Sequence, residues 1–225
     1  MEEARAYEEL RVGFTAAVSH ELRTPLARLL ALLESASLPD ADTEALLAQA
    51  REQVEEMSEL VDDVLFLSEL ESGREVVALG STAALPVLED VRDRLADSAE
   101  RADVTIRIAA DAGVELPLRR RMLQIIAENL VENSIRYAGP GSTLTLSAGN
   151  GVLTAADDGR GVEEDELPRL FERFYRSDRA RASRGTGLGL AIVKHVVTAA
   201  AGEVEATGGP GHGLTVTCSF MSAPG

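Results

Sequence analysis

Apolar residues recur at helical spacing through the first third of the chain. From about Glu3 to Glu34 they fall three or four residues apart, at Leu10, Phe14, Val18, Leu22, Leu26, Leu29 and Leu33. A second series runs from about Ala41 to Glu71, at Leu47, Ala50, Val54, Met57, Val61 and Val64. The stretch "SASLPDAD" between them is typical of a turn, with Asp40 or Asp42 as N-cap of the second helix. The pattern predicts two long helices joined by a short turn.

A hairpin of two such helices buries one seam of each helix and encloses no core. Pairing two hairpins into a four-helix bundle covers the remaining apolar surface, so we expect a homodimer. An intramolecular coiled-coil spacer is the alternative. The stretch "ESGREVV" breaks the heptad pattern, which places a domain boundary near Gly73. We therefore expect an antiparallel helical hairpin over residues 1–73 that forms a dimeric four-helix bundle.

Beyond that boundary the pattern changes to short strand-like runs with helical segments between them. The expected strands are "EVVAL", "VTIRIAA", "STLTLSA", "GVLTAADD", "EVEAT" and "LTVTCSF", and the expected helices cover about 83–101, 118–136 and 187–200. Helices that alternate with antiparallel-looking hairpins indicate a two-layer α/β sandwich. We expect this second domain over residues 74–225.

Charge and composition limit the classes of molecule that this chain is expected to bind. The chain of 225 residues carries a formal net charge of -16, so its overall field repels nucleic acid and anionic lipid. A bound phosphate compound would need a local group of cations, and these are arginines except for Lys194. The lone Cys218 excludes an internal disulfide. No apolar run could span a bilayer, so we expect a cytoplasmic protein, or the cytoplasmic part of a membrane-anchored sensor.

The stretch "SHELRTPL" carries the first candidate chemistry. Helical geometry turns His20 away from the apolar seam, which predicts an exposed imidazole. Glu21 can accept a hydrogen bond from one ring nitrogen and leave the other free as a nucleophile. Thr24 follows one turn later on the same face, where its hydroxyl can orient a water. Pro25 removes one backbone hydrogen bond and predicts a bend in the helix.

The second half contains a group of polar residues at helical spacing and a glycine-containing turn. In "NLVENSIRY", Asn129, Asn133 and Arg136 share a helix face next to Tyr137. Amide oxygens can complete the coordination of Mg²⁺, and an arginine can bind a phosphate. In "DDGRGV", Asp157 can accept a hydrogen bond from a ligand amino group. Its neighbours Gly159 and Gly161 allow close backbone approach.

A third string, "GTGLGLAIV", begins a helix with closely spaced glycines. Backbone N–H groups at such a helix start bind phosphates. The string contains Gly185, Thr186, Gly187, Leu188 and Gly189. The segment before it supplies the local cations, which are Arg173, Arg176, Arg179, Arg181 and Arg184.

Together, in this order, the strings resemble the catalytic half of a bacterial two-component sensor histidine kinase. "SHELRTPL" is similar to the H box of that family, and "NLVENSIRY" to its N box. "DDGRGV" resembles the first G box, "LFERFYR" the F box and "GTGLGLAIVK" the second G box. The resemblance covers nearly the whole chain. It implies a protein-histidine kinase of the gyrase, chaperone and histidine-kinase fold type that uses ATP and Mg²⁺.

The resemblance also implies a role for each matching residue in the hairpin. His20 would accept the phosphoryl group, Glu21 would be its base, and Thr24 would place the water that dephosphorylates the partner. That partner would be the receiver domain of a response regulator, which accepts the phosphoryl group on an aspartate.

In the second domain the implied roles concern the nucleotide. Asn133 would bind Mg²⁺ beside Asn129, and Arg136 would meet phosphate. Tyr137 and Asp157 would meet the adenine, with Gly159 and Gly161 forming the turn beside them. The remaining implied residues hold the lid over ATP and its phosphates, namely Phe171, Arg173, Phe174, Arg176, Gly185, Thr186, Gly187, Leu188 and Gly189.

Three positions depart from the family pattern. Ser134 stands where a small apolar residue is usual, and Asp158 where asparagine is frequent. Arg184 precedes Gly185 at a position where a second glycine is common in the family. A related ATPase without phosphohistidine and a binding scaffold are the alternatives. No sensor segment precedes the first helix, so we expect that an input domain lies outside this sequence.

Overall fold

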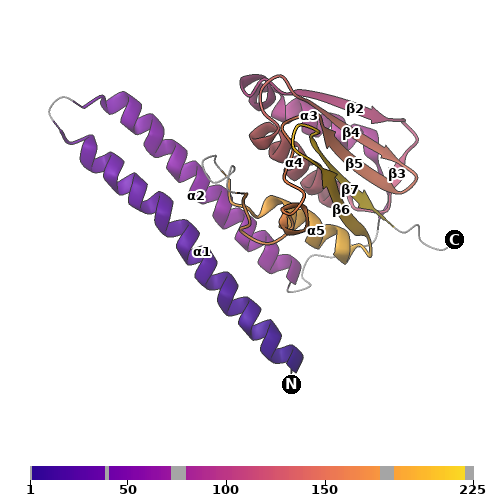
Figure 1. The fold of residues 1–225 in the computed structure, drawn as a ribbon, viewed down its shortest axis with the longest axis horizontal. Coiled ribbons are helices and arrows are strands. Elements are labelled where there is room, and N and C mark those ends of the chain that lie inside the picture. Colours follow the sequence, from indigo (N-terminus) through magenta and orange to yellow (C-terminus); the bar gives the residue numbers. More distant parts are fainter. Residues whose placement is uncertain (1, 39–40, 72–79, 178–184, 221–225) are drawn as a thin grey trace. The chain divides into compact units, whose positions relative to one another are not determined.

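The computed structural model describes residues 2–38, 41–71, 80–177 and 185–220, with side chains from residue 17 onward. Its contacts divide the chain into two compact units, residues 1–66 and 67–225 (Figure 1). The expected strand at 75–79, Asp40 and the arginines at 179, 181 and 184 lie outside the described residues. The boundary near Gly73 also lies there, so it stays a prediction.

The first unit is built from two helices, as the periodicity predicts. Helix α1 spans Glu2–Ser35 and contains Pro25, and helix α2 spans Thr43–Glu71. Asp42 caps α2, because its Oδ1 accepts a hydrogen bond of 3.1 Å from the backbone N–H of Ala45. Such a cap satisfies one of the free donors at a helix start. One of the two capping residues considered from the sequence is therefore confirmed.

The apolar seam of α2 is shifted from the predicted one. Ala50 and Leu60 are its most buried side chains in this unit, and the partly buried positions that continue their spacing are Leu46, Gln53, Met57 and Val64. Leu47, Val54 and Val61 remain 43–49% exposed. The predicted seam therefore combined two helix faces, because alternating three- and four-residue steps also connect positions on adjacent faces.

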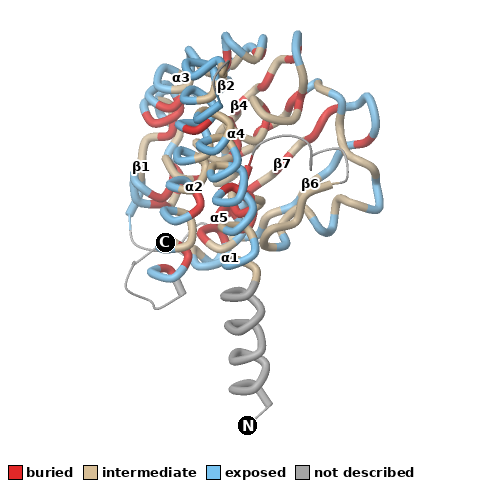
Figure 2. Tube along the Cα trace, turned by 90° about the vertical axis from the view of Figure 1, so that its left-hand side faces the viewer, coloured by how far each residue is buried: buried red, intermediate tan, exposed pale blue. Residues whose placement is uncertain are grey.

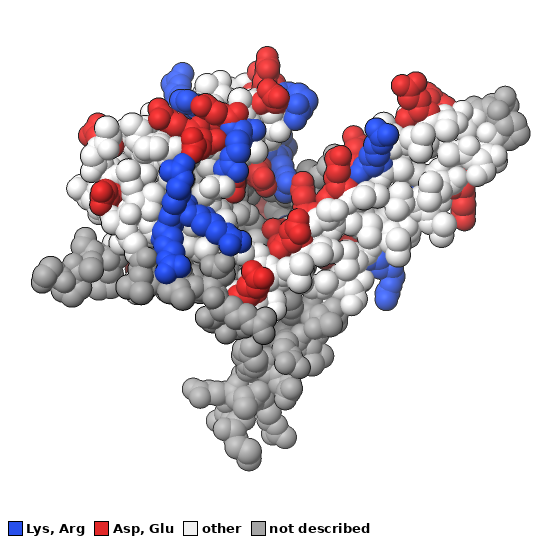
Figure 3. Space-filling view, turned by 180° about the vertical axis from the view of Figure 1, so that it is seen from behind, with Lys and Arg blue, Asp and Glu red and all other residues white. Residues whose placement is uncertain are grey.

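The exposed face of α2 and several leucines of α1 and the turn carry large apolar side chains, which we call the exposed apolar stripe of the hairpin. In the described part of the chain, all exposed large hydrophobic side chains belong to this unit and its turn, and they are Leu26, Leu30, Leu33, Leu38, Leu47, Val54, Val61 and Leu65. Figure 3 shows uncharged surface along the helical pair between acidic side chains. Exposed large apolar side chains concentrated in one part of a molecule are typical of an interaction surface.

The second unit contains a five-stranded sheet in the order β2-β4-β5-β7-β6. Its strands are β2 (Thr105–Ala110), β4 (Thr143–Gly149), β5 (Val152–Asp157), β6 (Glu203–Gly208) and β7 (Leu214–Ser219). Three helices cover one face of it (Figure 1), and they are α3 (Ala84–Arg101), α4 (Arg120–Tyr137) and α5 (Gly189–Ala199). The predicted two-layer α/β sandwich is confirmed, with helix bounds within two residues of expectation.

Strand pairing includes the expected hairpin and one parallel pair. β4 and β5 pair antiparallel, as expected for a hairpin, whereas β2 pairs with β4 in parallel, with Thr105 opposite Thr143. The chain reaches the parallel position by crossing over through α4, as parallel neighbours require. Two short strands, β1 (Thr82–Ala83) and β3 (Glu115–Leu116), pair antiparallel and were not predicted. A short 3₁₀ helix, η1, follows at Leu167–Arg169.

The core of this unit lies between the helices and the sheet, where buried residues gather (Figure 2). Cys218 on β7 belongs to it, and burial raises the pKa of its thiol to about 12. Such a thiol is unreactive near neutral pH. Within residues 2–38, 41–71, 80–177 and 185–220, no helix has the length and hydrophobicity that a bilayer-spanning segment needs.

Candidate functional site

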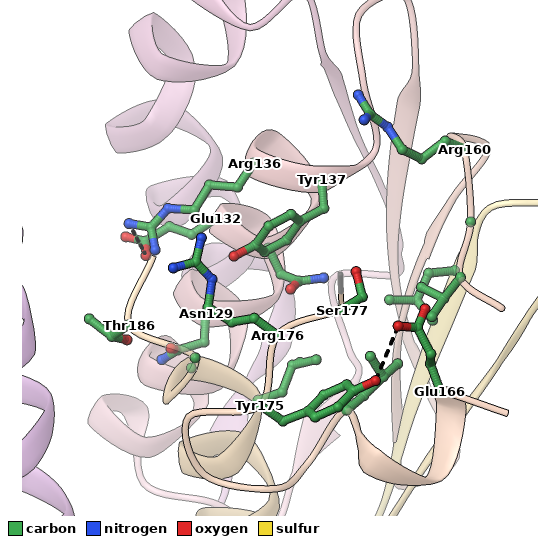
Figure 4. Close-up of a pocket in the computed structure, with 18 of the residues that line it drawn as sticks. Asn129, Glu132, Arg136, Tyr137, Arg160, Glu166, Tyr175, Arg176, Ser177 and Thr186 are labelled. Atoms are coloured by element: carbon green, nitrogen blue, oxygen red, sulfur yellow. Dashed lines mark hydrogen bonds and ion pairs between the residues drawn. The ribbon is translucent and has the colours of Figure 1, made fainter. Parts of the chain in front are cut away.

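A cavity of the second unit lies between α4 and the segments that follow β5 and precede α5. Figure 4 shows its lining side chains from α4 on one side and from the 160–177 segment on the other. The lining comprises Asn129, Glu132, Asn133, Arg136, Tyr137, Arg160, Gly161, Val162, Glu163, Glu166, Leu170, Tyr175, Arg176, Ser177, Thr186, Gly187, Gly189, Leu190 and Leu214.

Helix α4 brings the predicted polar face into this cavity. Asn129, Asn133, Arg136 and Tyr137 all line it, because residues three and four apart share a helix face. Asn129 donates its side-chain N–H to the carbonyl of Ile125 at 2.8 Å, so its amide oxygen stays available.

Glu132 also lines the cavity, although no sequence motif indicated it. Its carboxylate lies 3.6 Å from the Arg136 guanidinium, and Figure 4 draws this ion pair. Position 132 stands between the two predicted asparagines, so the same helical spacing could have indicated it. Nothing in its residue type distinguishes it from an ordinary surface glutamate.

The glycine string packs against α4 at the start of α5. A Cβ added at Gly189 would lie 2.7 Å from Asn129 Oδ1, so a larger residue here would displace the Asn129 side chain. The carbonyl of Gly187 accepts a 2.9 Å hydrogen bond from the backbone N–H of Phe174. The structure thus joins the second glycine string to the "LFERFYR" segment. Free N–H groups at the start of a helix favour anionic ligands.

Asp157 ends β5 beside the cavity and is 9% exposed. Its Oδ1 accepts hydrogen bonds from the backbone N–H groups of Gly159, at 3.0 Å, and Leu214, at 3.3 Å. Its Oδ2 accepts one from the Ser134 hydroxyl at 3.2 Å. Leu214 itself lines the cavity, so Asp157 is tied directly to the cavity wall.

The turn after β5 needs its second glycine. Gly161 has a φ of +70°, and an added Cβ would lie 1.9 Å from the carbonyl oxygen of Gly209. No larger residue fits this contact. The backbone N–H of Gly211 also donates to the carbonyl of Arg160 at 2.7 Å. The β6–β7 turn therefore supports the loop that forms one wall of the cavity.

The same 160–177 segment contains a polar contact that the sequence did not indicate. The Tyr175 hydroxyl donates to Glu166 Oε1 at 3.2 Å, as Figure 4 draws it. The Arg169 guanidinium lies 4.3 Å from the centre of the Tyr175 ring, within cation–π range. Partial burial and the hydrogen bond to Glu166 raise the pKa of Tyr175. Because these residues are separated by loop, no periodic signal in the sequence could have paired them.

Nine of the predicted nucleotide-site residues line the cavity. Each of the others lies within three sequence positions of a lining residue. The nine are Asn129, Asn133, Arg136, Tyr137, Gly161, Arg176, Thr186, Gly187 and Gly189. The predicted residues outside the lining are Asp157, Gly159, Phe171, Arg173, Phe174, Gly185 and Leu188. Leu188 is fully buried, so its side chain packs in the core and only its backbone could face a ligand.

The cavity has the chemistry to hold a nucleotide. Val162, Leu170 and Leu190 offer apolar surface to a base, while Arg136 and Arg176 offer positive charge. A ligand with a flat base and several phosphates matches this division. The Asn133 amide oxygen is a suitable ligand for Mg²⁺, which otherwise relies on water and substrate phosphates. Among the described residues, acidic, histidine and cysteine side chains form no metal-binding group of three or more.

The residues predicted to carry the transfer chemistry lie on α1 in the first unit. The His20 side chain is 74% exposed, and its Nδ1 lies 3.6 Å from Glu21 Oε1. This distance is within ion-pair range but longer than a hydrogen bond. Thr24 is exposed one turn later, and Pro25 is buried within the helix. The predicted exposure of His20 is confirmed.

Two family models match the two units. Residues 10–73 match the "His Kinase A (phospho-acceptor) domain", and residues 119–224 match "Histidine kinase-, DNA gyrase B-, and HSP90-like ATPase". The sensor-like histidine kinase SenX3 of Mycolicibacterium smegmatis is 33% identical over 96% of this chain and 59% of its own length. The phosphate regulon sensor protein PhoR of Pseudomonas aeruginosa is 38% identical over 96% of this chain and 51% of its own.

Solved structures agree with these matches. The Acinetobacter baumannii histidine kinase AdeS superposes with a TM-score of 0.74 at 25% identity, over 91% of this chain and 98% of that one. The histidine kinase ThkA in complex with response regulator protein TrrA gives a TM-score of 0.75 at 18% identity. The superposition covers 97% of this chain and 64% of that one. At that identity the likeness to ThkA concerns the fold alone. The chain spans about half the length of the curated relatives it matches.

Proposed function

Because this chain belongs to the histidine kinases, we propose that it transfers the γ-phosphoryl group of ATP to His20 and then to an aspartate of a response regulator. One observation carries the proposal. The same chain presents a 74% exposed histidine within the phospho-acceptor match and a cavity lined by Asn133, Arg136 and Gly187 within the ATPase match. His20 could therefore accept a phosphoryl group from a nucleotide bound in the cavity.

In the cavity, the chain binds and orients the nucleotide. Asp157 would accept a hydrogen bond from the adenine amino group, and Arg136 would neutralise phosphate charge. The start of α5 at Gly189 directs backbone N–H groups toward the phosphates. Asn133 would hold Mg²⁺, which supplies charge neutralisation at the phosphates when it is bound. Positioning and electrostatics of this kind provide most of the catalysis in phosphoryl transfer.

On α1, His20 acts as the nucleophile. The Nδ1 atom faces Glu21, so the Nε2 lone pair is the one directed to solvent and able to attack. A bond forms between Nε2 and the γ-phosphorus while the bond from that phosphorus to the ADP oxygen breaks. The Nδ1 proton moves toward the Glu21 carboxylate, which stabilises the charge on the ring. A second transfer forms a bond from the phosphorus to the regulator's aspartate and breaks the bond to Nε2, and the proton shared with Glu21 returns to Nδ1, which restores the neutral imidazole.

Two further parts of the proposal concern partners. The exposed apolar stripe of the hairpin would be covered by a second copy of the chain, which gives a dimeric four-helix bundle. Thr24 would orient a water for dephosphorylation of the regulator. The relatives named above are sensor proteins about twice as long, so we propose that a sensor segment, through which any membrane attachment would occur, belongs to the whole protein.

Labelling with γ-phosphate-labelled ATP tests the proposal against its rivals. A phosphohistidine is acid-labile and base-stable, so label with that behaviour on the protein supports the kinase. Release of free phosphate without protein-bound label would indicate an ATPase of the related gyrase and chaperone group. Neither label nor release, at nucleotide concentrations that saturate binding, would indicate a scaffold that acts through its dimer contacts.

A further inference from the structure

Ser134 lies one residue beyond Asn133 on α4 and departs from the family pattern at that position. It is 3% exposed, and buried hydroxyls in folded proteins are nearly always hydrogen-bonded. Its hydroxyl donates to Asp157 Oδ2 at 3.2 Å across 23 residues of sequence. Ser134 therefore contacts the Asp157 carboxylate, which the proposed function assigns to recognition of the adenine base.

The hydrogen bonds of Asp157 leave one position open. A carboxylate oxygen offers two lone-pair sites, and Oδ1 uses both for the backbone N–H groups of Gly159 and Leu214. Oδ2 uses one for Ser134 and keeps one. The torsion that turns a carboxylate about its Cβ–Cγ bond is broad, so the Ser134 bond restrains the direction of that remaining lone pair.

We propose that Ser134 is a positioning residue that holds the Asp157 carboxylate so that the open acceptor of Oδ2 meets the exocyclic amino group of adenine. This inference rests on the proposed function, because it takes the nucleotide to bind in the cavity beside Asp157. A single fixed acceptor favours adenine, which presents an amino group there. It disfavours guanine, which presents a carbonyl oxygen, since two acceptors would then face each other without a donor.

The experiment compares nucleotides that differ only at the base. We would measure the affinity of the full chain for ATP and for purine riboside triphosphate, which lacks the exocyclic amino group, with Mg²⁺ present. Ser134→Ala should weaken ATP roughly 3- to 10-fold, the range of a single hydrogen bond, and leave the analogue unchanged. Ser142→Ala is the matched control, because Ser142 is also a buried serine, 6% exposed, whose hydroxyl donates outside the cavity to Gly139.

A double-mutant cycle separates positioning from packing. In the Asp157→Asn background the carboxylate is gone, so Ser134→Ala should no longer change ATP affinity. A purely structural serine would instead weaken ATP and the analogue equally, in both backgrounds, and this result would overturn the inference. So would an unchanged ratio of the two affinities in Ser134→Ala.

The same measurements distinguish a failure of this inference from a failure of the proposed function. Wild-type protein that binds neither nucleotide would overturn the proposed function and this inference with it. Wild-type protein that prefers ATP over the analogue, together with a Ser134→Ala variant that keeps the full preference, would overturn this inference alone.

Discussion

The two units of this chain hold their functional groups in opposite ways. On the hairpin, His20 is 74% exposed, and side chains such as Leu30, which is 59% exposed, have no cover within the chain. In the α/β unit, Asp157 is 9% exposed and accepts three hydrogen bonds. The apolar residues of the α/β unit form a core between its helices and its sheet.

This difference fits the partners that each unit is proposed to meet. A small ligand in a cavity gains affinity from groups that are fixed before it arrives. A histidine that meets a nucleotide site in one step and a response regulator in another must be reachable from solvent. Under this proposal the hairpin is completed by other protein surfaces, whereas the described lining of the cavity comes from one chain. The following predictions test this contrast, from the largest expected effect to the smallest.

Removal of the exposed nucleophile should give the largest effect. In His20→Gln, stable protein label from γ-labelled ATP should disappear completely, because the side chain no longer has a nucleophilic ring nitrogen. ATP affinity should not change, since the cavity belongs to the other unit. His195→Gln, a change at the partly buried histidine on α5, is the control and should keep its label. Undiminished label in His20→Gln would disprove the assignment.

Thr24 tests whether exposed groups on the hairpin act in separate steps. Thr24→Ala should leave autophosphorylation nearly unchanged and slow dephosphorylation of the regulator by about 10²- to 10⁴-fold, the usual contribution of a group that positions a proton or water. The measurement is a pair of rates on one variant, namely labelling with ATP and phosphate loss from purified phospho-regulator with ADP. An equal fall in both rates would mean that Thr24 only supports the helix near Pro25.

The exposed apolar stripe should matter only when a second chain is present. Val54→Glu places a charge on this stripe, and in a dimer both copies lose about 1.5 kcal/mol or more of apolar burial. The dimer dissociation constant should therefore rise roughly 100-fold. Gln49→Glu adds the same charge at an exposed polar position of α2 and should leave the dimer intact. Sedimentation equilibrium measures both, and a wild-type chain that stays monomeric would contradict the prediction.

The buried carboxylate should give the smallest of these effects because its neighbours can adjust. In Asp157→Asn, the new amide oxygen can keep the bonds from Gly159 and Leu214, and the amide nitrogen can donate to the Ser134 hydroxyl. The fold should persist, while ATP affinity falls about 5- to 150-fold through the lost acceptor. Calorimetric titration gives the affinity, and thermal unfolding checks the fold. Equal ATP affinity in both proteins would show that Asp157 does not contact the base.

Local patterns in the sequence predicted most of the fold. Helix bounds follow from periodicity and from capping residues such as Asp42, and the five main strands follow from short β-rich runs. The parallel pairing of β2 with β4 could not be predicted, because it depends on a crossover and not on either strand's own residues. Spacing also identified the apolar positions of α2, but spacing alone does not say which face packs within the hairpin and which face a second chain covers.

In the candidate site, too, local motifs could be predicted from the sequence, and contacts between distant segments could not. Residues at helical spacing, such as Asn129 and Asn133, and glycines before a helix were visible in the sequence because each motif is local. The contacts of Ser134 with Asp157 and of Glu166 with Tyr175 were not visible, because no local spacing pattern indicates which residues of different segments meet. Sequence therefore predicted which residues contribute to the cavity but not the hydrogen bonds that hold them in place.

The bond from the Leu214 N–H to Asp157 also has a consequence for the order of folding. It joins residues 57 positions apart, across the pairing of β5 with β7, the last strand of the sheet along the chain. Contacts of high sequence separation form slowly, because the intervening chain must first be ordered. The hairpin, in contrast, emerges before the α/β unit during synthesis, and its helices need only local contacts to begin. We therefore expect that a growing chain acquires its phosphoacceptor helix early, and that its nucleotide site is completed only when β7 has joined the sheet.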